Sequence, residues 1–217
     1  MLSLFSDPTR LIFFIVALVV AITVHEFAHA LVATLLGDPT PKEQRRLTLN
    51  PLAHLDPLGT LTLFIAGFGW GRPVIYNPNY LRRSRRSEFL IAVAGPLSNL
   101  IIAFLFALPG RIYFAQTGIL PEAPLFILLE IIVQLNIVLA VFNLLPIPPL
   151  DGSKIFYLIF GRPGVSSTTT YFEQIGPLVL IALIFLERLL NISILFRIMD
   201  PILTFFRWLV GSVMWPF

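Results

Sequence analysis

Long runs of apolar residues dominate the chain and predict helices that cross a membrane. The first run covers residues 11–36, begins after an Asp-Pro pair and ends before a Gly-Asp-Pro turn, which are ordinary start and stop signals for a helix. A helix of 26 residues is about 39 Å long, enough to cross a hydrocarbon core of about 30 Å. A signal peptide is the alternative, but the run is longer than such a peptide requires and contains three ionisable residues.

Other apolar runs complete the predicted architecture. Residues 58–70 are too few to span and include three glycines, which favours a re-entrant or interfacial segment, and Thr60, Thr62 and Ile65 favour strand character within it. Residues 192–215 are apolar but interrupted by charges and a proline, so they can span, break or lie in the interface. The pattern predicts an all-α polytopic membrane protein of about five to six membrane helices, with a small re-entrant β element between the first two long helices. The remaining predicted spans cover residues 88–108, 126–145 and 172–190.

Composition argues against most other classes of protein. Hydrophobic residues make up 57% of the chain and charged residues 12%, about half the charge of a typical soluble domain. This balance disfavours a soluble enzyme, a disordered chain and a coiled coil. The chain has no cysteine, which excludes disulfides, thiolate metal sites and cysteine nucleophiles.

The positions of the basic residues predict the orientation of the chain in the membrane. Eight of the 15 Lys and Arg residues lie between the first two predicted spans, whereas only Arg111 lies between the second and third. By the positive-inside rule, residues 37–87 face the cytoplasm, which explains the net charge of +3 better than nucleic-acid binding does. The end of the first span and the segment after the third span then share the cytoplasmic side. We expect a multi-pass protein of the cell membrane.

An H-E-x-x-H motif lies inside the first predicted span, at His25-Glu26-Phe27-Ala28-His29. Positions i and i+4 place both imidazoles on one helix face, where two nitrogens can hold Zn²⁺. The adjacent glutamate is placed to act as a general base on a water molecule at the metal. Ionisable groups within lipid are costly and usually serve a function, although a polar trio that only holds helices together is the alternative.

A catalytic zinc site usually has three protein ligands, so the motif needs a partner. Asp151 lies in a Pro-Leu-Asp-Gly segment directly after the third span, on the same predicted side as the end of the first span. Prolines keep the backbone irregular there, and such backbone is tolerated at membrane depth only inside protein or beside a wet cavity. Asp151 is therefore the preferred third ligand, and a plain turn is the alternative. His54, just past the first span, is a competing ligand, a proton carrier or a simple turn residue.

These motifs together resemble those of the site-2 proteases, which are zinc intramembrane metalloproteases. Besides H-E-x-x-H and Pro-Leu-Asp-Gly, residues 50–59, 69–74 and 94–99 resemble signatures of a compact prokaryotic branch of that family, without PDZ or CBS domains. The resemblance covers roughly residues 12–160. We therefore expect residues 1–217 to form a single membrane-embedded metalloprotease core.

The resemblance also implies roles for particular residues. It implies that Zn²⁺ is held by His25, His29 and Asp151, with Glu26 as the general base. The implied function is a zinc-dependent intramembrane endopeptidase that cleaves transmembrane segments of membrane proteins, in regulated intramembrane proteolysis, with its active site toward the cytoplasm. The expected partners are a transmembrane protein substrate and the lipid bilayer, with no nucleic acid, while a homo-oligomer stays open.

Three polar residues are candidates for substrate binding. Asn143, on the last turn of the third span, matches an asparagine that the resemblance assigns to the substrate, with helix capping as the alternative. Asn99, in the second span, is a candidate for which hydrogen bonding between helices is the favoured alternative. His54 is the third. The resemblance also implies that residues 58–76 present an edge to an unwound substrate strand, and an interfacial anchor is the alternative.

Two other classes of function use the same residues. A membrane metal transporter would need His or acidic residues stepping across the bilayer, whereas the three histidines here lie within 30 residues of one another. A non-catalytic scaffold is the other class. A Glu26→Gln change separates these from a protease, because only proteolysis requires the general base.

Overall fold

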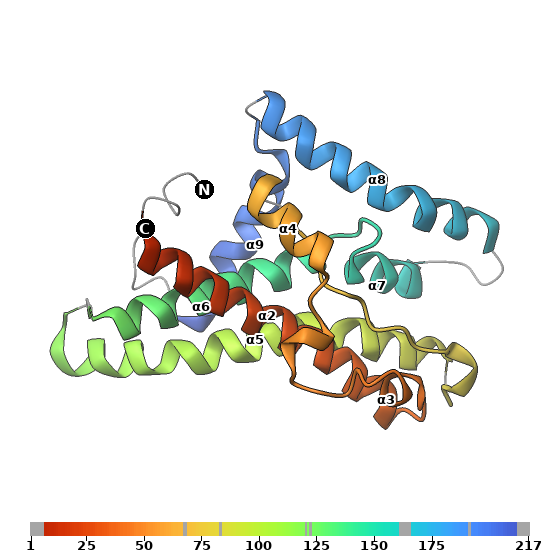
Figure 1. Cartoon of the computed structure of the whole chain (residues 1–217), viewed down its shortest axis with the longest axis horizontal. Helices are drawn as coiled ribbons and strands as arrows, with labels where there is room; N and C mark the ends of the chain where they lie inside the picture. The colour runs from red at the N-terminus through yellow and green to blue at the C-terminus, as the bar shows by residue number, and fades with distance from the viewer. Residues whose placement is uncertain are drawn as a thin grey trace.

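The computed structural model describes most of the chain, and three long helices dominate it (Figure 1). These are α2 (Pro8–Leu35), α5 (Ser84–Thr117) and α6 (Pro124–Asn143), which pack against one another. Within the described part of the chain, they are the helices long and apolar enough to cross a membrane. The described residues are 7–66, 69–82, 84–119, 121, 123–160, 166–190 and 192–211.

Shorter helices surround these three. α9 packs against α6, and the Arg207 guanidinium on α9 donates a hydrogen bond to Gln134 Oε1 on α6 over 3.0 Å. α7 packs against α5 and begins at Asp151. The remaining elements are α3 (Thr40–Glu43), η1 (Pro51–Ala53), α4 (Pro57–Ala66), η2 (Pro78–Tyr80), α7 (Asp151–Phe160), α8 (Ser166–Leu190) and α9 (Ile194–Val210).

The expected number of about five to six membrane helices is wrong for the residues that the structure describes, where three helices qualify. Within α8, the apolar helix found among the described residues is Ile175–Glu187, which is shorter than a span needs. α9 is 17 residues long and carries charges on one side, so it is amphipathic rather than uniformly apolar.

The predicted re-entrant β element is also wrong, because no β-strand occurs among the described residues. The described part of the segment instead forms α4, and the β-like contact found beside it is an isolated bridge between Leu55 and Gly71. Asp56 caps the helix, its carboxylate accepting from the Gly59 backbone N–H at 2.8 Å, and Pro57 occupies the first turn. A helix satisfies its own backbone hydrogen bonds at membrane depth, which a short strand cannot do.

The glycines of this segment allow close packing. A Cβ on Gly59 would collide with the Trp70 carbonyl, and a Cβ on Gly69 would collide with the Gly59 carbonyl. The segment after α4 therefore lies directly against that helix. Gly67 and Phe68, which also belonged to the predicted element, lie outside the described residues.

A stripe of small residues on α2 turns the H-E-x-x-H motif inward. Ala17, Ala21, His25 and His29 follow one another at intervals of four, and all are buried. Alanines let the neighbouring helices approach closely, which is how helices pack tightly within a membrane. Both imidazoles consequently lie in the helix interface, where α2 meets α5.

A buried metal centre

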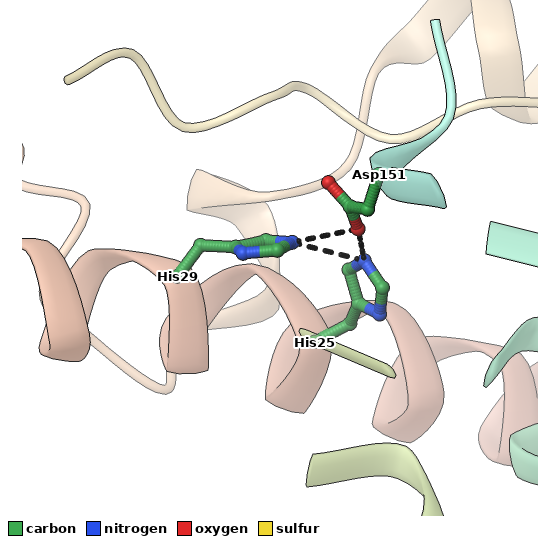
Figure 2. Close-up of side chains that lie close together, drawn as sticks. All are labelled: His25, His29 and Asp151. Atoms are coloured by element: carbon green, nitrogen blue, oxygen red, sulfur yellow. Dashed lines mark hydrogen bonds and ion pairs between the residues drawn. The ribbon is translucent and has the colours of Figure 1, made fainter. Parts of the chain in front are cut away.

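Three side chains of metal-ligating type converge at one point. His25 and His29 come from α2, and Asp151 comes from the first residue of α7 (Figure 2). The two Nε2 atoms lie 3.1 Å apart, and each lies 3.1 Å from Asp151 Oδ2. All three residues are buried. The fold therefore joins the two motifs that are more than a hundred residues apart in the sequence.

The outer nitrogens of both imidazoles are fixed by acceptors. His29 Nδ1 donates to the Ile91 carbonyl over 2.7 Å, and His25 Nδ1 meets Asn99 Oδ1 at 2.6 Å. The amide of Asn99 donates to the Ala21 carbonyl and to Asn136 Oδ1, so its own oxygen must accept. Each Nδ1 therefore carries the ring proton, and each Nε2 presents a lone pair to the centre.

This arrangement fits Zn²⁺. Two imidazole lone pairs and a carboxylate oxygen meet with no proton between them, which is an unfavourable contact unless a cation joins them. The three separations of 3.1 Å are close to the roughly 3.3 Å that separates the ligands of a tetrahedral zinc ion. Two histidines and one carboxylate are also a known catalytic zinc set that leaves a fourth position open.

Gly95 on α5 leaves the space in which the histidines meet. A Cβ at this position would lie 2.6 Å from His25 Nε2 and closer still to His29 Nε2. Real Cβ atoms do not tolerate such contacts, so any larger residue would push into the ligand atoms. The Gly-Pro pair in the second span therefore has a role in the site as well as in helix packing.

Asp151 is held in its ionised form. Burial by itself would raise its pKa, but in the metal-free site, where the histidines can take up a second proton on Nε2, the Coulombic attraction of His29 and hydrogen bonds from both protonated rings lower the pKa well below its usual range. The Lys154 ammonium lies 4.0 Å from Asp151 Oδ1, one turn further along α7. An anionic carboxylate is the form that ligates a metal.

Glu26 points to the segment that follows α4. Its Oε2 accepts a hydrogen bond from the Val74 backbone N–H over 3.1 Å. Its Oε1 is 3.8 Å from where a Cβ on Gly71 would lie. The backbone therefore holds Oε2, and Oε1 lies beside Gly71, which has no side chain.

A buried arginine ties this segment to the preceding loop. Arg46 is only 7% exposed, and its guanidinium donates to the Ala53 carbonyl and to the Arg72 carbonyl, the latter over 3.4 Å. Burial and the neighbouring Arg72 lower the pKa of Arg46, while Glu26 acts in the opposite direction. Arg46 thus holds the backbone two residues before the Val74 amide that contacts Glu26.

A cavity of about 210 Å³ opens between α2, α4, α6 and α8. Trp70 and Gly71, close to Glu26, form part of its wall. The lining is mainly apolar, with hydroxyl and amide groups contributed by two residues. Its lining includes Leu18, Ile22, Thr60, Leu63, Phe142 and Asn143.

The structure separates the three predicted substrate residues. Asn143 lines the cavity, and its amide donates to the Leu139 carbonyl over 3.0 Å. Asn99 is fully buried behind His25. His54 is fully buried outside the metal cluster, where its Nε2 donates to the Thr48 carbonyl over 2.7 Å. A role in substrate binding stays a prediction for each of them.

Sequence reasoning missed three residues of the site: Asn136, Gly95 and Arg46. Asn136 could have been noticed as an amide within an apolar span, since intramembrane polar groups usually have a function. Gly95 follows no spacing rule that would signal a role in the site, because its effect depends on the approach of another helix. Arg46 was counted among the cytoplasmic charges, and nothing in its sequence context signals that it is buried.

Fold and site together describe a membrane protein with a buried cluster of residues that could hold a metal ion, and known proteins share its sequence. The family model for Peptidase family M50 matches residues 107–186, which include Asn143 and Asp151. The "Putative zinc metalloprotease YwhC" of Bacillus subtilis is 43% identical over 174 residues, which cover 79% of this chain and 79% of that protein. The chain belongs to peptidase family M50, the site-2 proteases, and is a zinc metalloprotease.

More distant relatives agree. The "Putative zinc metalloprotease Rip2" of Mycobacterium tuberculosis is 35% identical over 139 residues, which cover 61% of this chain and 51% of that protein. Rip2 of Mycolicibacterium smegmatis is 32% identical over 137 residues. The matched part therefore spans about half the length of the Rip2 proteins. No solved structure matches the chain.

Proposed function

We propose that this chain is an intramembrane endopeptidase that cleaves transmembrane segments of other membrane proteins. His25, His29 and Asp151 hold the Zn²⁺, and Glu26 is the general base. The observation that carries the proposal is the convergence of these ligand atoms at 3.1 Å inside the packed spanning helices, with Glu26 on the same helix. Buried ionisable groups at this position are costly, and catalysis accounts for their presence.

Glu26 performs the proton transfers of peptide hydrolysis. When bound, Zn²⁺ supplies Lewis acidity, which acidifies water and polarises a carbonyl group. Glu26 Oε1 takes a proton from the attacking water as its oxygen bonds to the scissile carbonyl carbon. The same carboxylate then passes this proton to the leaving nitrogen as the C–N bond breaks. The Val74 amide holds Oε2, which leaves Oε1 as the oxygen that we assign to the proton transfers.

The cavity beside Glu26 suits an apolar substrate segment. Its walls are mainly aliphatic and aromatic, as the side chains of a transmembrane segment require. A helical peptide bond is shielded by its own hydrogen bonds, so the substrate must unwind locally and find other partners. Asn143 and Thr60 on the cavity wall supply such partners.

The basic residues favour an orientation in the cell membrane with the active site toward the cytoplasm. In that orientation both motifs of the site would lie toward the cytoplasm, because the H-E-x-x-H motif lies in the second half of α2 and Asp151 follows the end of α6. Cleavage in this position would release a cytoplasmic part of the substrate, which is consistent with regulated intramembrane proteolysis.

The test compares purified wild type with Glu26→Gln on a panel of single-span substrates, with zinc content measured on the same samples. Glu43→Gln is the matched control, because Glu43 is exposed on α3 and outside the site. The proposal predicts about one zinc per chain in all three proteins and cleavage lost only in Glu26→Gln. Equal cleavage by Glu26→Gln and wild type would refute the role of Glu26, and zinc transport retained by that variant would favour a transporter.

A further inference from the structure

Two adjoining hollows lie at the polar ends of α2 and α5. The larger has a volume of about 510 Å³ and lies between the last turn of α2 and the first turns of α5. The smaller, about 380 Å³, lies between α5 and the end of α7. Arg86 and Leu90 line both hollows, so the face of α5 that carries these two residues separates one hollow from the other.

Each hollow combines cationic and apolar walls. Arg82 and Arg86 line the larger one together with Leu35, which is 75% exposed, and Leu90, which is 50% exposed. These leucines belong to the apolar spanning parts of α2 and α5, whereas the arginines mark the point where the chain leaves them. A ligand that fits must therefore carry negative charge at one end and hydrocarbon at the other.

The charge of Arg82 and Arg86 is not neutralised by the protein. Among the residues that the structure describes, neither side chain has an ion-pair partner, and no carboxylate lines either hollow. The nearby Asp38 is fully buried, with its oxygens accepting from the Thr40 and Asn77 backbone amides over 2.9 and 2.6 Å.

Arg85 has a different role from its neighbours. Its Nε donates to the Leu158 carbonyl over 2.8 Å, which fixes the end of α7 against α5. The wall of the smaller hollow is therefore held in position, with Phe89 and Leu158 providing its apolar surface. Both side chains are half-buried, and their accessible apolar surface suits acyl chains better than water.

We propose that these hollows form a binding site for an anionic phospholipid, with its phosphodiester on Arg82 and Arg86 and its acyl chains along Leu35 and Leu90. Arginine is suited to phosphate because its guanidinium presents a planar fork of donors. Basic pockets between membrane helices on the cytoplasmic side bind anionic head groups in the same way. The site is separate from the metal centre and does not depend on the proposed proteolysis.

The experiment measures lipid selectivity of the full-length chain in detergent micelles. Native mass spectrometry compares bound phosphatidylglycerol with bound phosphatidylcholine of identical acyl chains, supplied in equal amounts. In Arg82→Gln/Arg86→Gln, the preference for phosphatidylglycerol should fall about 30-fold, since each arginine near a lipid phosphate contributes about fivefold.

A matched control removes two cations from the same predicted side of the membrane. Lys42→Gln/Arg45→Asn removes two exposed charges that line neither hollow. Asparagine is chosen because Arg45 has a φ of 57°, which asparagine tolerates better than most residues. This control should keep the preference of wild type.

Three results would overturn the proposal. The first is an equal loss in both double variants, which would mean that diffuse surface charge attracts the lipid. The second is no preference in wild type. The third is displacement of the lipid by an equal concentration of soluble glycerophosphoglycerol, which would show that a free phosphodiester fills the site without acyl chains.

Discussion

Replacing Gly95 by alanine adds a single methyl group at the point where both zinc-ligating imidazoles meet. The added Cβ would lie 2.6 Å from His25 Nε2, about 0.8 Å short of the 3.4 Å at which ordinary van der Waals contact begins. Since α5 backbone packs against α2, the ring must move rather than the helix. A displacement of about 1 Å in a positioned group costs about 100-fold in function, so we expect zinc affinity to fall at least about 100-fold.

The assay is competition for zinc with a chelator of known affinity, combined with thermal unfolding. Alanine is a better helix former than glycine by about 1 kcal/mol, so lost zinc cannot be attributed to a weaker α5 helix. Gly118→Ala is the control, because its Cβ would meet no atom within 4 Å and can only strain a φ of +67°. If Gly95→Ala kept the zinc affinity of wild type, the inferred position of the metal would be wrong.

Two further predictions concern residues that support the site. Asn99→Leu removes the acceptor of His25 Nδ1 and should weaken zinc binding about 10- to 100-fold in the chelator assay. Asn99→Asp keeps an acceptor oxygen and should lose less zinc affinity. Equal losses of affinity in the two variants would contradict the assigned hydrogen bond. Arg46→Met removes the donor to the Ala53 and Arg72 carbonyls and should lower the initial cleavage rate about tenfold or more with zinc content unchanged. The exposed Arg45→Asn is its control, and lost zinc in Arg46→Met would show that Arg46 supports the metal centre instead of the segment over Glu26.

Sequence pattern was sufficient for the residues whose chemistry depends on local spacing. His25 and His29 share a helix face because they are four residues apart, and the structure places their Nε2 atoms 3.1 Å from each other. Local spacing could not identify Asp151, because it lies more than a hundred residues from both histidines. Its place followed from the membrane orientation, because the end of α2 and the start of α7 must lie on the same side.

Residues whose role depends on how helices pack could not be predicted in this way. The amide of Asn136 supports His25 only through Asn99. This series of hydrogen bonds requires α2, α5 and α6 to meet at one depth. The clearance provided by Gly95 likewise exists only once α5 lies against α2. The spacing of residues along one helix does not show which residues of a neighbouring helix will face them.

The predicted β element shows a different kind of error. Thr60, Thr62 and Ile65 favoured a strand, but the Asp56-Pro57 pair before them is a helix start signal, and the structure follows it. The glycines serve close contact between α4 and the segment after it. Local capping thus decided the secondary structure, and the glycines decided only the packing.

The most direct test of the metal centre is anomalous diffraction at the zinc edge from crystals of the purified protein. The account predicts one strong peak bonded to His25 Nε2, His29 Nε2 and an Asp151 carboxylate oxygen at about 2.0–2.2 Å. A zinc peak elsewhere in the chain, or none in protein that cleaves substrate, would contradict it.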